Sequence, residues 1–192
     1  MMHKAATVIS RLFDPLVTAT VLMGIAFRVS GMETIRMLLL FVSVYILVVG
    51  IPIFLLVGGL RQGKISNWDL SERRERIVPM LVELCLILVS GMLMYHFGNA
   101  FLFHIVLVFF AWFTGFFAIT LFWKISGHVA TNTLVAGILM GWFGVSLWPL
   151  LFIIPFIAWS RVVRKNHTVA QVIGGLLYSV IFLALGNRIG FL

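Results

Sequence analysis

Long apolar runs are the feature of this sequence that most restricts its fold. One of them, from Met37 to Gly59, contains no charged residue, and a helix needs about 20 such residues to cross a bilayer. Of the 192 residues, 62% are hydrophobic and 10% are charged, which is more apolar than soluble domains are. Because backbone polar groups inside a bilayer need internal partners, the sequence predicts an all-α, polytopic transmembrane helical bundle.

Seven runs are candidate spans, and no repeat or linker divides them, so we expect a single membrane-integral domain over residues 1–192. The runs are 15–29, 37–59, 79–95, 100–123, 129–146, 149–162 and 168–186. The first run is short and follows an interruption at Asp14-Pro15, so the bundle has six spans if this run is only interfacial. Trp148-Pro149 predicts a tight turn, and Gly174-Gly175 predicts close helix packing in the last span.

The charge pattern narrows the classes of partner. The net charge is +8, but the cations lie between apolar runs rather than along one soluble face, so no nucleic acid partner is expected. They fit the anionic headgroups of membrane lipids, and some fit phosphate. A solvated basic loop is the preferred interpretation for Arg164 and Lys165. The single cysteine, Cys85, lies in an apolar run and provides neither a disulfide framework nor a zinc motif.

Three polar segments, 60–78, 124–128 and 160–167, interrupt the apolar runs, and two candidate spans separate each from the next. All three are therefore expected on the same membrane face, which also holds the N-terminus. That face carries eleven Lys and Arg residues, against three on the other face. The positive-inside rule then predicts that the polar segments face the cytoplasm.

The third polar segment carries residue types that suit phosphate chemistry. Ser160-Arg161 is followed after five residues by His167, and Gln171 comes four residues later. Residues four apart share a helical face, so Gln171 is expected to hold His167 if a helix has begun there. A histidine held by a neighbour can act as a nucleophile toward phosphorus, and an arginine can clamp phosphate oxygens with two hydrogen bonds.

The second segment, from Lys124 to His128, ends in Ser126-Gly127-His128 where the fifth span should begin. A helix start presents free N–H groups and a positive dipole, and Gly127 allows a close approach of the backbone to an anion. Alternatively, Ser126 is only a helix N-cap and His128 is an interfacial polar residue.

The first segment contains Arg73 and Arg76, which are three residues apart and share a helical face. One interpretation is a solvated amphipathic helix with internal ion pairs. The other is a pair of guanidinium groups that bind the same phosphate.

Residues 60–190 resemble the membrane-integral branch of the type 2 phosphatidic acid phosphatase superfamily. That family has the motifs Lys-x6-Arg-Pro, Pro-Ser-Gly-His and Ser-Arg-x5-His-x3-Asp. The third matches as Ser160-Arg161 and His167, with Gln171 in place of Asp, and the second matches as Ser126-Gly127-His128, with Ile125 in place of Pro. The first is degenerate: Arg76 and Pro79 are separated by two residues, and Asp69 replaces the expected Lys.

The resemblance implies an enzyme that hydrolyses lipid phosphates without metal or other cofactor. His167 resembles the nucleophile that forms a phosphohistidine, and His128 resembles the general acid. The implied phosphate-binding set consists of Arg161, Ser126, Gly127 and Arg76, and we add Arg73 and Lys124 to it. Gln171 and Ser160 are expected to orient these groups.

The replacement of Asp by Gln171 removes the charge that would stabilise a cationic His167. Either another carboxylate substitutes, for which Glu83 is the sequence candidate, or turnover is slower. The third possibility is a non-catalytic protein that binds or transports lipid phosphate and retains the fold. Polyprenyl diphosphate, phosphatidic acid and phosphatidylglycerophosphate all fit as lipids, and short loops favour an isoprenoid diphosphate.

Overall fold

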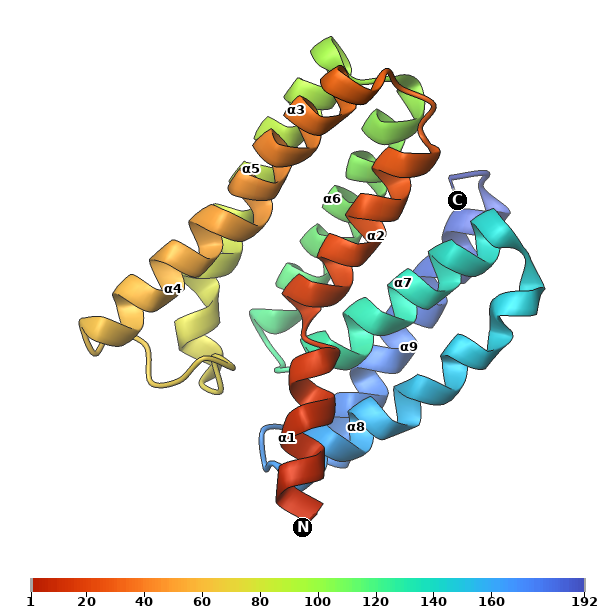
Figure 1. The fold of residues 1–192 in the computed structure, drawn as a ribbon. Helices are drawn as coiled ribbons and strands as arrows, with labels where there is room; N and C mark the ends of the chain where they lie inside the picture. The colour runs from red at the N-terminus through yellow and green to blue at the C-terminus, as the bar shows by residue number, and fades with distance from the viewer. Residues whose placement is uncertain (1, 192) are drawn as a thin grey trace. The chain divides into compact units, whose positions relative to one another are not determined.

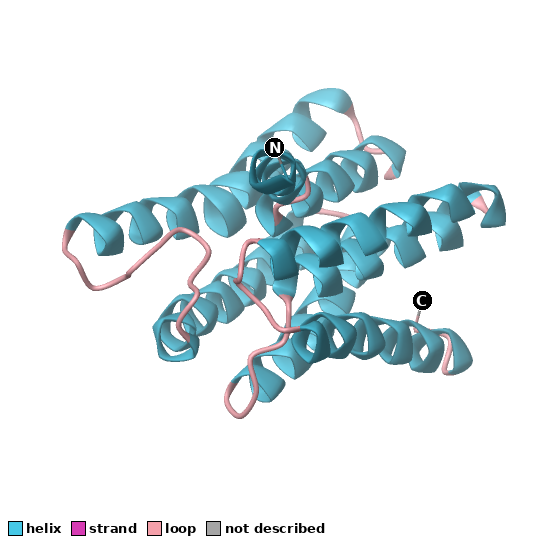
Figure 2. Cartoon of the chain, turned by 90° about the horizontal axis from the view of Figure 1, so that it is seen from below, coloured by secondary structure: helices cyan, strands magenta, loops and turns pink. Residues whose placement is uncertain are grey.

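The computed structural model describes residues 2–191, and within them the regular elements are all helical (Figure 2). Six helical segments are long and apolar enough to cross a membrane: Met2–Val29, Thr34–Arg61, Arg73–Phe97, Ala100–Thr120, Val145–Val163 and Val169–Arg188. The prediction of an all-α, polytopic membrane bundle is confirmed, and the chain is a multi-pass membrane protein.

The chain divides into two compact units. The terminal unit combines the residues up to 22 with those from 124 onward, and the central unit consists of residues 23–123. Each unit is described by itself below.

The first candidate span is longer than the sequence indicated. Helix α1 (Met2–Leu12) precedes α2 (Pro15–Val29), and only Phe13 and Asp14 separate them. The apolar pattern missed α1 because Lys4 and Arg11 interrupt it. The run predicted at 129–146 forms α7 (Gly127–Phe143), whose 17 residues are fewer than those of each of the six candidate spans, and α7 is not among the six.

The prediction of a tight turn at Trp148-Pro149 is wrong, because the chain reverses its direction earlier, at Gly144. Gly144 has a φ of 93° and ends α7, a conformation that glycine adopts without steric cost. Residues Val145–Phe152 then form the 3₁₀ helix η2, which contains Pro149 and leads into α8 (Ile153–Val163).

In the terminal unit, α1 packs against α8, and α7 packs against α9 (Val169–Arg188), as Figure 1 shows. Val129, Ile154, Ile157 and Val172 form a buried apolar cluster from α7, α8 and α9. A Cβ atom on Gly175 would lie 2.6 Å from the carbonyl oxygen of Ser126. The close packing predicted for Gly174-Gly175 is therefore confirmed at Gly175, and it brings α9 against the start of α7.

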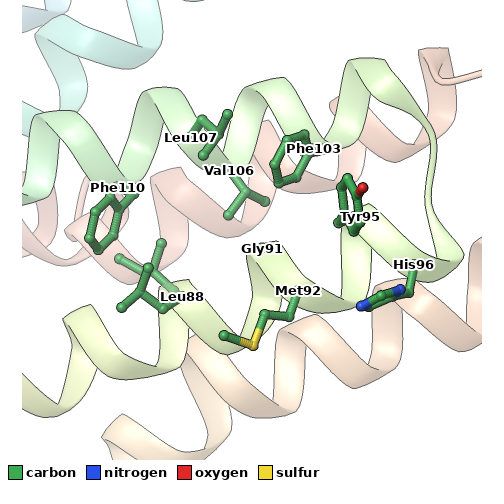
Figure 3. A pocket seen from close by; sticks show the side chains of 10 residues that line it. Leu88, Gly91, Met92, Tyr95, His96, Phe103, Val106, Leu107 and Phe110 are labelled. Atoms are coloured by element: carbon green, nitrogen blue, oxygen red, sulfur yellow. The ribbon is translucent and has the colours of Figure 1, made fainter.

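The central unit contains α3 (Thr34–Tyr45), the π-helical turn η1 (Ile46–Gly50), α4 (Ile51–Arg61), α5 (Arg73–Phe97) and α6 (Ala100–Thr120). Asn99 caps α6, since its Oδ1 accepts a hydrogen bond of 2.9 Å from the Leu102 N–H. Between α5 and α6 lies an apolar hollow of about 260 Å³, with Tyr95, His96 and Phe103 at one end (Figure 3).

Candidate functional site

The second and third polar segments meet in the terminal unit. The Ser126 N–H donates to the Gln171 carbonyl at 3.0 Å, and Lys124 Nζ donates to the Asn166 carbonyl at 2.7 Å. These two bonds hold the start of α7 against the first turn of α9 and the α8–α9 connection. Residues predicted to share a membrane face thus lie in one cluster, although they are more than thirty positions apart in sequence.

Arg161 is the central cation of this cluster. It lies in the last turn of α8 and only 1% of it is exposed. Its Nη1 donates to Ser10 Oγ at 2.6 Å, and Nη1 of Arg164 donates to the same oxygen, also at 2.6 Å. Arg164, expected in a solvated loop, is therefore half-buried and bonded within the cluster. Lys165 is exposed, as expected.

His128 faces the same guanidinium group. It is 7% exposed, and its Nε2 lies 3.4 Å from Arg161 Nη1 and 3.5 Å from Ser10 Oγ. Asp14 Oδ2 lies 3.7 Å from that nitrogen. Two charged side chains, those of Arg161 and Asp14, and the Ser10 hydroxyl therefore surround one ring nitrogen of His128.

His167 lies immediately before α9, and the start of that helix orients it. Thr168 is the N-cap: its Oγ1 accepts from the Gln171 N–H at 3.3 Å, while Gln171 Oε1 accepts from the Thr168 N–H at 3.1 Å. This reciprocal pair is a capping box. The same Oε1 lies 3.2 Å from His167 Nδ1, so Gln171 reaches His167 as its spacing predicts.

The capping box also fixes the tautomer of His167. A backbone N–H can only donate, so the side-chain oxygen of Gln171, not its NH₂ group, must face Thr168. That oxygen can only accept, and Nδ1 of His167 must therefore carry the hydrogen in their contact. In the neutral imidazole the lone pair is then on Nε2, which is the form that a nucleophile requires.

The remaining predicted residues of the terminal unit have structural contacts. Ser126 is fully buried and caps α7, with its Oγ accepting from the Val129 N–H at 3.5 Å, and Gly127 is the first residue of that helix. Ser160 is also fully buried, and its hydroxyl donates to the Ile157 carbonyl of its own helix at 2.7 Å. Both hydroxyls therefore stabilise helix ends near Arg161 and His128.

Arg73 and Arg76 belong to the central unit, where each bonds backbone carbonyls. Arg73 Nη1 donates to the Leu121 carbonyl just beyond the C-terminal end of α6. Arg76 is 7% exposed, and its Nε donates to the Leu70 carbonyl at 2.8 Å. These contacts stabilise the loop before α5 and the end of α6. Glu83 also lies in the central unit, within α5.

Sequence reasoning missed Ser10, Asp14 and Asn132. Asn132, one turn after His128, donates from Nδ2 to the carbonyls of Phe13 at 2.9 Å and His128 at 2.8 Å. Asp14 was noted only as an interruption of an apolar run. The available signal was its position, because it is the only acidic residue in residues 1–22 and 124–192.

No family model, curated protein or solved structure matches this chain. The arrangement of the cluster and the sequence motifs therefore carry the functional argument.

The cluster is suited to bind an oxyanion. Two guanidinium groups converge on one acceptor oxygen, and a histidine nitrogen lies beside the buried one. Buried charges are stabilised when they are paired, and arginine is suited to bidentate contact with phosphate-like anions. Asp14 is the only acidic residue in residues 1–22 and 124–192, so the cations of the cluster outnumber its carboxylates. An anionic ligand would balance this excess positive charge.

Proposed function

We propose that this chain is a membrane-integral phosphatase that removes phosphate from a lipid phosphate or an isoprenoid diphosphate, as its resemblance to the type 2 phosphatidic acid phosphatase superfamily implies. One observation carries the proposal. The fully buried Arg161 lies beside His128, and Arg164 converges on the same Ser10 oxygen. A phosphate dianion bound there would place its charge among these groups.

In the proposed reaction, Nε2 of His167 attacks the terminal phosphorus, and the bond between that phosphorus and the leaving oxygen breaks. The leaving oxygen belongs to the lipid alcohol in a monophosphate and is the bridging oxygen in a diphosphate. His128 gives its proton to that leaving oxygen, and Arg161 balances the charge on the phosphoryl oxygens. Water then attacks the phosphohistidine, the P–N bond breaks and His128 takes the proton from water. The products are inorganic phosphate and the lipid alcohol, or inorganic phosphate and the lipid monophosphate when the substrate is a diphosphate, and both histidines return to their starting forms.

The position of these residues supports a lipid substrate. His128 lies in the first turn of α7, His167 immediately precedes α9, and Arg161 lies in the last turn of α8. In a membrane protein such helix ends lie near the interface, where a headgroup can enter while its apolar chain remains in the bilayer. By the positive-inside rule we place this site on the cytoplasmic face.

The test is phosphate release from a panel of lipid phosphates in detergent micelles, with and without chelator. The His167→Ala variant should lose at least about 10³-fold in rate, because it removes the nucleophile. His96→Ala is the matched control, since His96 is exposed at the end of α5, and it should retain the activity. Equal rates for His167→Ala and wild type would overturn the assignment.

A second candidate function is lipid phosphate binding or transport without turnover. The neutral Gln171 at His167 Nδ1 favours it, because no carboxylate stabilises a cationic phosphohistidine at that nitrogen. Saturable binding of the panel lipids with no phosphate release from any of them would support this candidate against the phosphatase.

A further inference from the structure

The carboxylate of Asp14, which lies near the N-terminus of the sequence, faces His128. Its Oδ2 lies 3.7 Å from His128 Nε2, and their side chains are 14% and 9% exposed. Asp14 follows α1 and precedes Pro15, the first residue of α2. The break between these two helices therefore faces the candidate site.

Two sets of hydrogen bonds hold this carboxylate in place. Asp14 Oδ1 accepts from the Leu16 N–H at 3.1 Å, so one oxygen caps α2 while the other faces the histidine. Asn132 bonds the carbonyls of both Phe13 and His128, and its own Oδ1 accepts from Thr18 Oγ1 at 3.1 Å. The α1–α2 junction is thus attached to α7 one turn from His128.

We propose that Asp14 is the positioning residue for His128, holding its imidazole in the protonated form and orientation that a general acid requires. The proposal rests on the phosphatase function stated above. An opposite charge favours the cationic form of a histidine, whereas Arg161 Nη1 at 3.4 Å opposes it, as does Arg164, which bonds the Ser10 oxygen beside the ring. Substrate phosphate would offset the charges of both arginines, and Asp14 would then dominate.

The two histidines consequently have different partners that suit different roles. His167 faces the neutral oxygen of Gln171 and keeps a lone pair on Nε2. His128 faces the carboxylate of Asp14, which favours a proton on Nε2. Environments that separate two like groups in this way define the acid and the nucleophile of a reaction. The proton that His128 gives to the leaving oxygen is recovered from water.

Leaving-group dependence tests this role. An alkyl phosphate needs protonation of its leaving oxygen, whereas p-nitrophenyl phosphate does not, because its phenolate is already a good leaving group. Asp14→Asn should lower kcat for the lipid alkyl phosphate by about 10²-fold, within the range of general acid catalysis. It should change kcat for p-nitrophenyl phosphate by less than about threefold. Asp14→Glu, which restores the charge, should recover part of the lost rate.

Thr18→Val is the matched control, because it removes two hydrogen bonds at the same junction, to Asn132 Oδ1 and to the Asp14 carbonyl, without changing a charge. It should affect the two substrates equally. If Asp14→Asn also slowed both substrates equally, Asp14 would have only a structural role and the proposal would fail.

A second measurement keeps the proposal separate from the phosphatase assignment. ¹⁵N NMR of histidine-labelled protein in micelles reports the protonation of the His128 ring. Both proteins are measured with inorganic phosphate over a range of pH. At some pH in that range, His128 should be cationic in the wild type and neutral in the Asp14→Asn variant. Absence of turnover in wild type would overturn the phosphatase, and identical His128 spectra in the two proteins would overturn the role of Asp14.

Discussion

At the scale of single residues, Gln171 is the informative departure from the resembled motif. Its Oε1 accepts from both His167 and Thr168. Gln171→Glu would preserve both acceptor contacts, since Glu also completes a capping box, and would add the missing charge. We predict that this variant raises kcat by at least about tenfold, because loss of the comparable charge in the Ser-His-Asp template costs on the order of 10⁴ in rate.

Single-turnover formation of the acid-labile phosphohistidine measures this effect directly. Gln171→Met provides the control, because it has a similar length but cannot accept the bond from His167, and it should slow the step. A Glu variant that folds normally yet forms the intermediate no faster than wild type would show that the charge does not limit the reaction.

The sequence predicted the proximity of some of these residues and could not predict that of others. The count of spans placed residues 124–128 and 160–167 on one face, and the bonds between them agree with that count. The contact between His167 and Gln171 followed from a four-residue spacing. Asp14 and His128 are 114 positions apart, and only tertiary packing of the α1–α2 junction on α7 brings them together.

At the scale of elements, the contact between α9 and the start of α7 controls the site. A Cβ on Gly175 would lie 2.6 Å from the Ser126 carbonyl oxygen, and backbone cannot yield as a side chain does. We predict that Gly175→Ala destabilises the protein by about 1–3 kcal/mol, as overpacking does. Thermal unfolding in detergent, followed by circular dichroism, measures this loss.

Gly141→Ala is the control for this prediction. Gly141 lies in α7, and a Cβ there would meet nothing within 4 Å, so alanine should leave stability unchanged or raise it slightly. Equal melting temperatures for Gly175→Ala and wild type would mean that α7 and α9 can separate at no cost.

Periodicity and apolar length identified the helices better than they identified the helix ends. The long runs predicted the spans because the bilayer requires them, whereas α1 escaped notice because its cations interrupt the apolar pattern. The reversal at Gly144 depends on a single positive φ. Pro149 was a stronger sequence signal for a turn, yet η2 accommodates it within a 3₁₀ helix.

At the scale of the whole molecule, the net positive charge is unevenly distributed. Residues 1–22 and 124–192 contain seven Lys and Arg against one acidic residue, whereas residues 23–123 contain seven against five. The excess therefore lies mainly in the terminal unit, which also holds the buried Arg161. The anion-binding role proposed above would account for this excess near the site. The proposed cytoplasmic orientation would account for the exposed Lys4 and Lys165 through the positive-inside rule.

The orientation of the terminal unit gives a prediction for the intact membrane. Helix α9 has 20 residues and is about 30 Å long at 1.5 Å per residue, so its two ends lie at opposite surfaces. In a Cys85→Ser background, Lys4→Cys should resist a membrane-impermeant maleimide in intact cells and react after permeabilisation. Ile189→Cys, beyond the end of α9 and 77% exposed, should react in intact cells. The reverse labelling pattern would place the site outside the cytoplasm, where it would act on lipids of the outer leaflet.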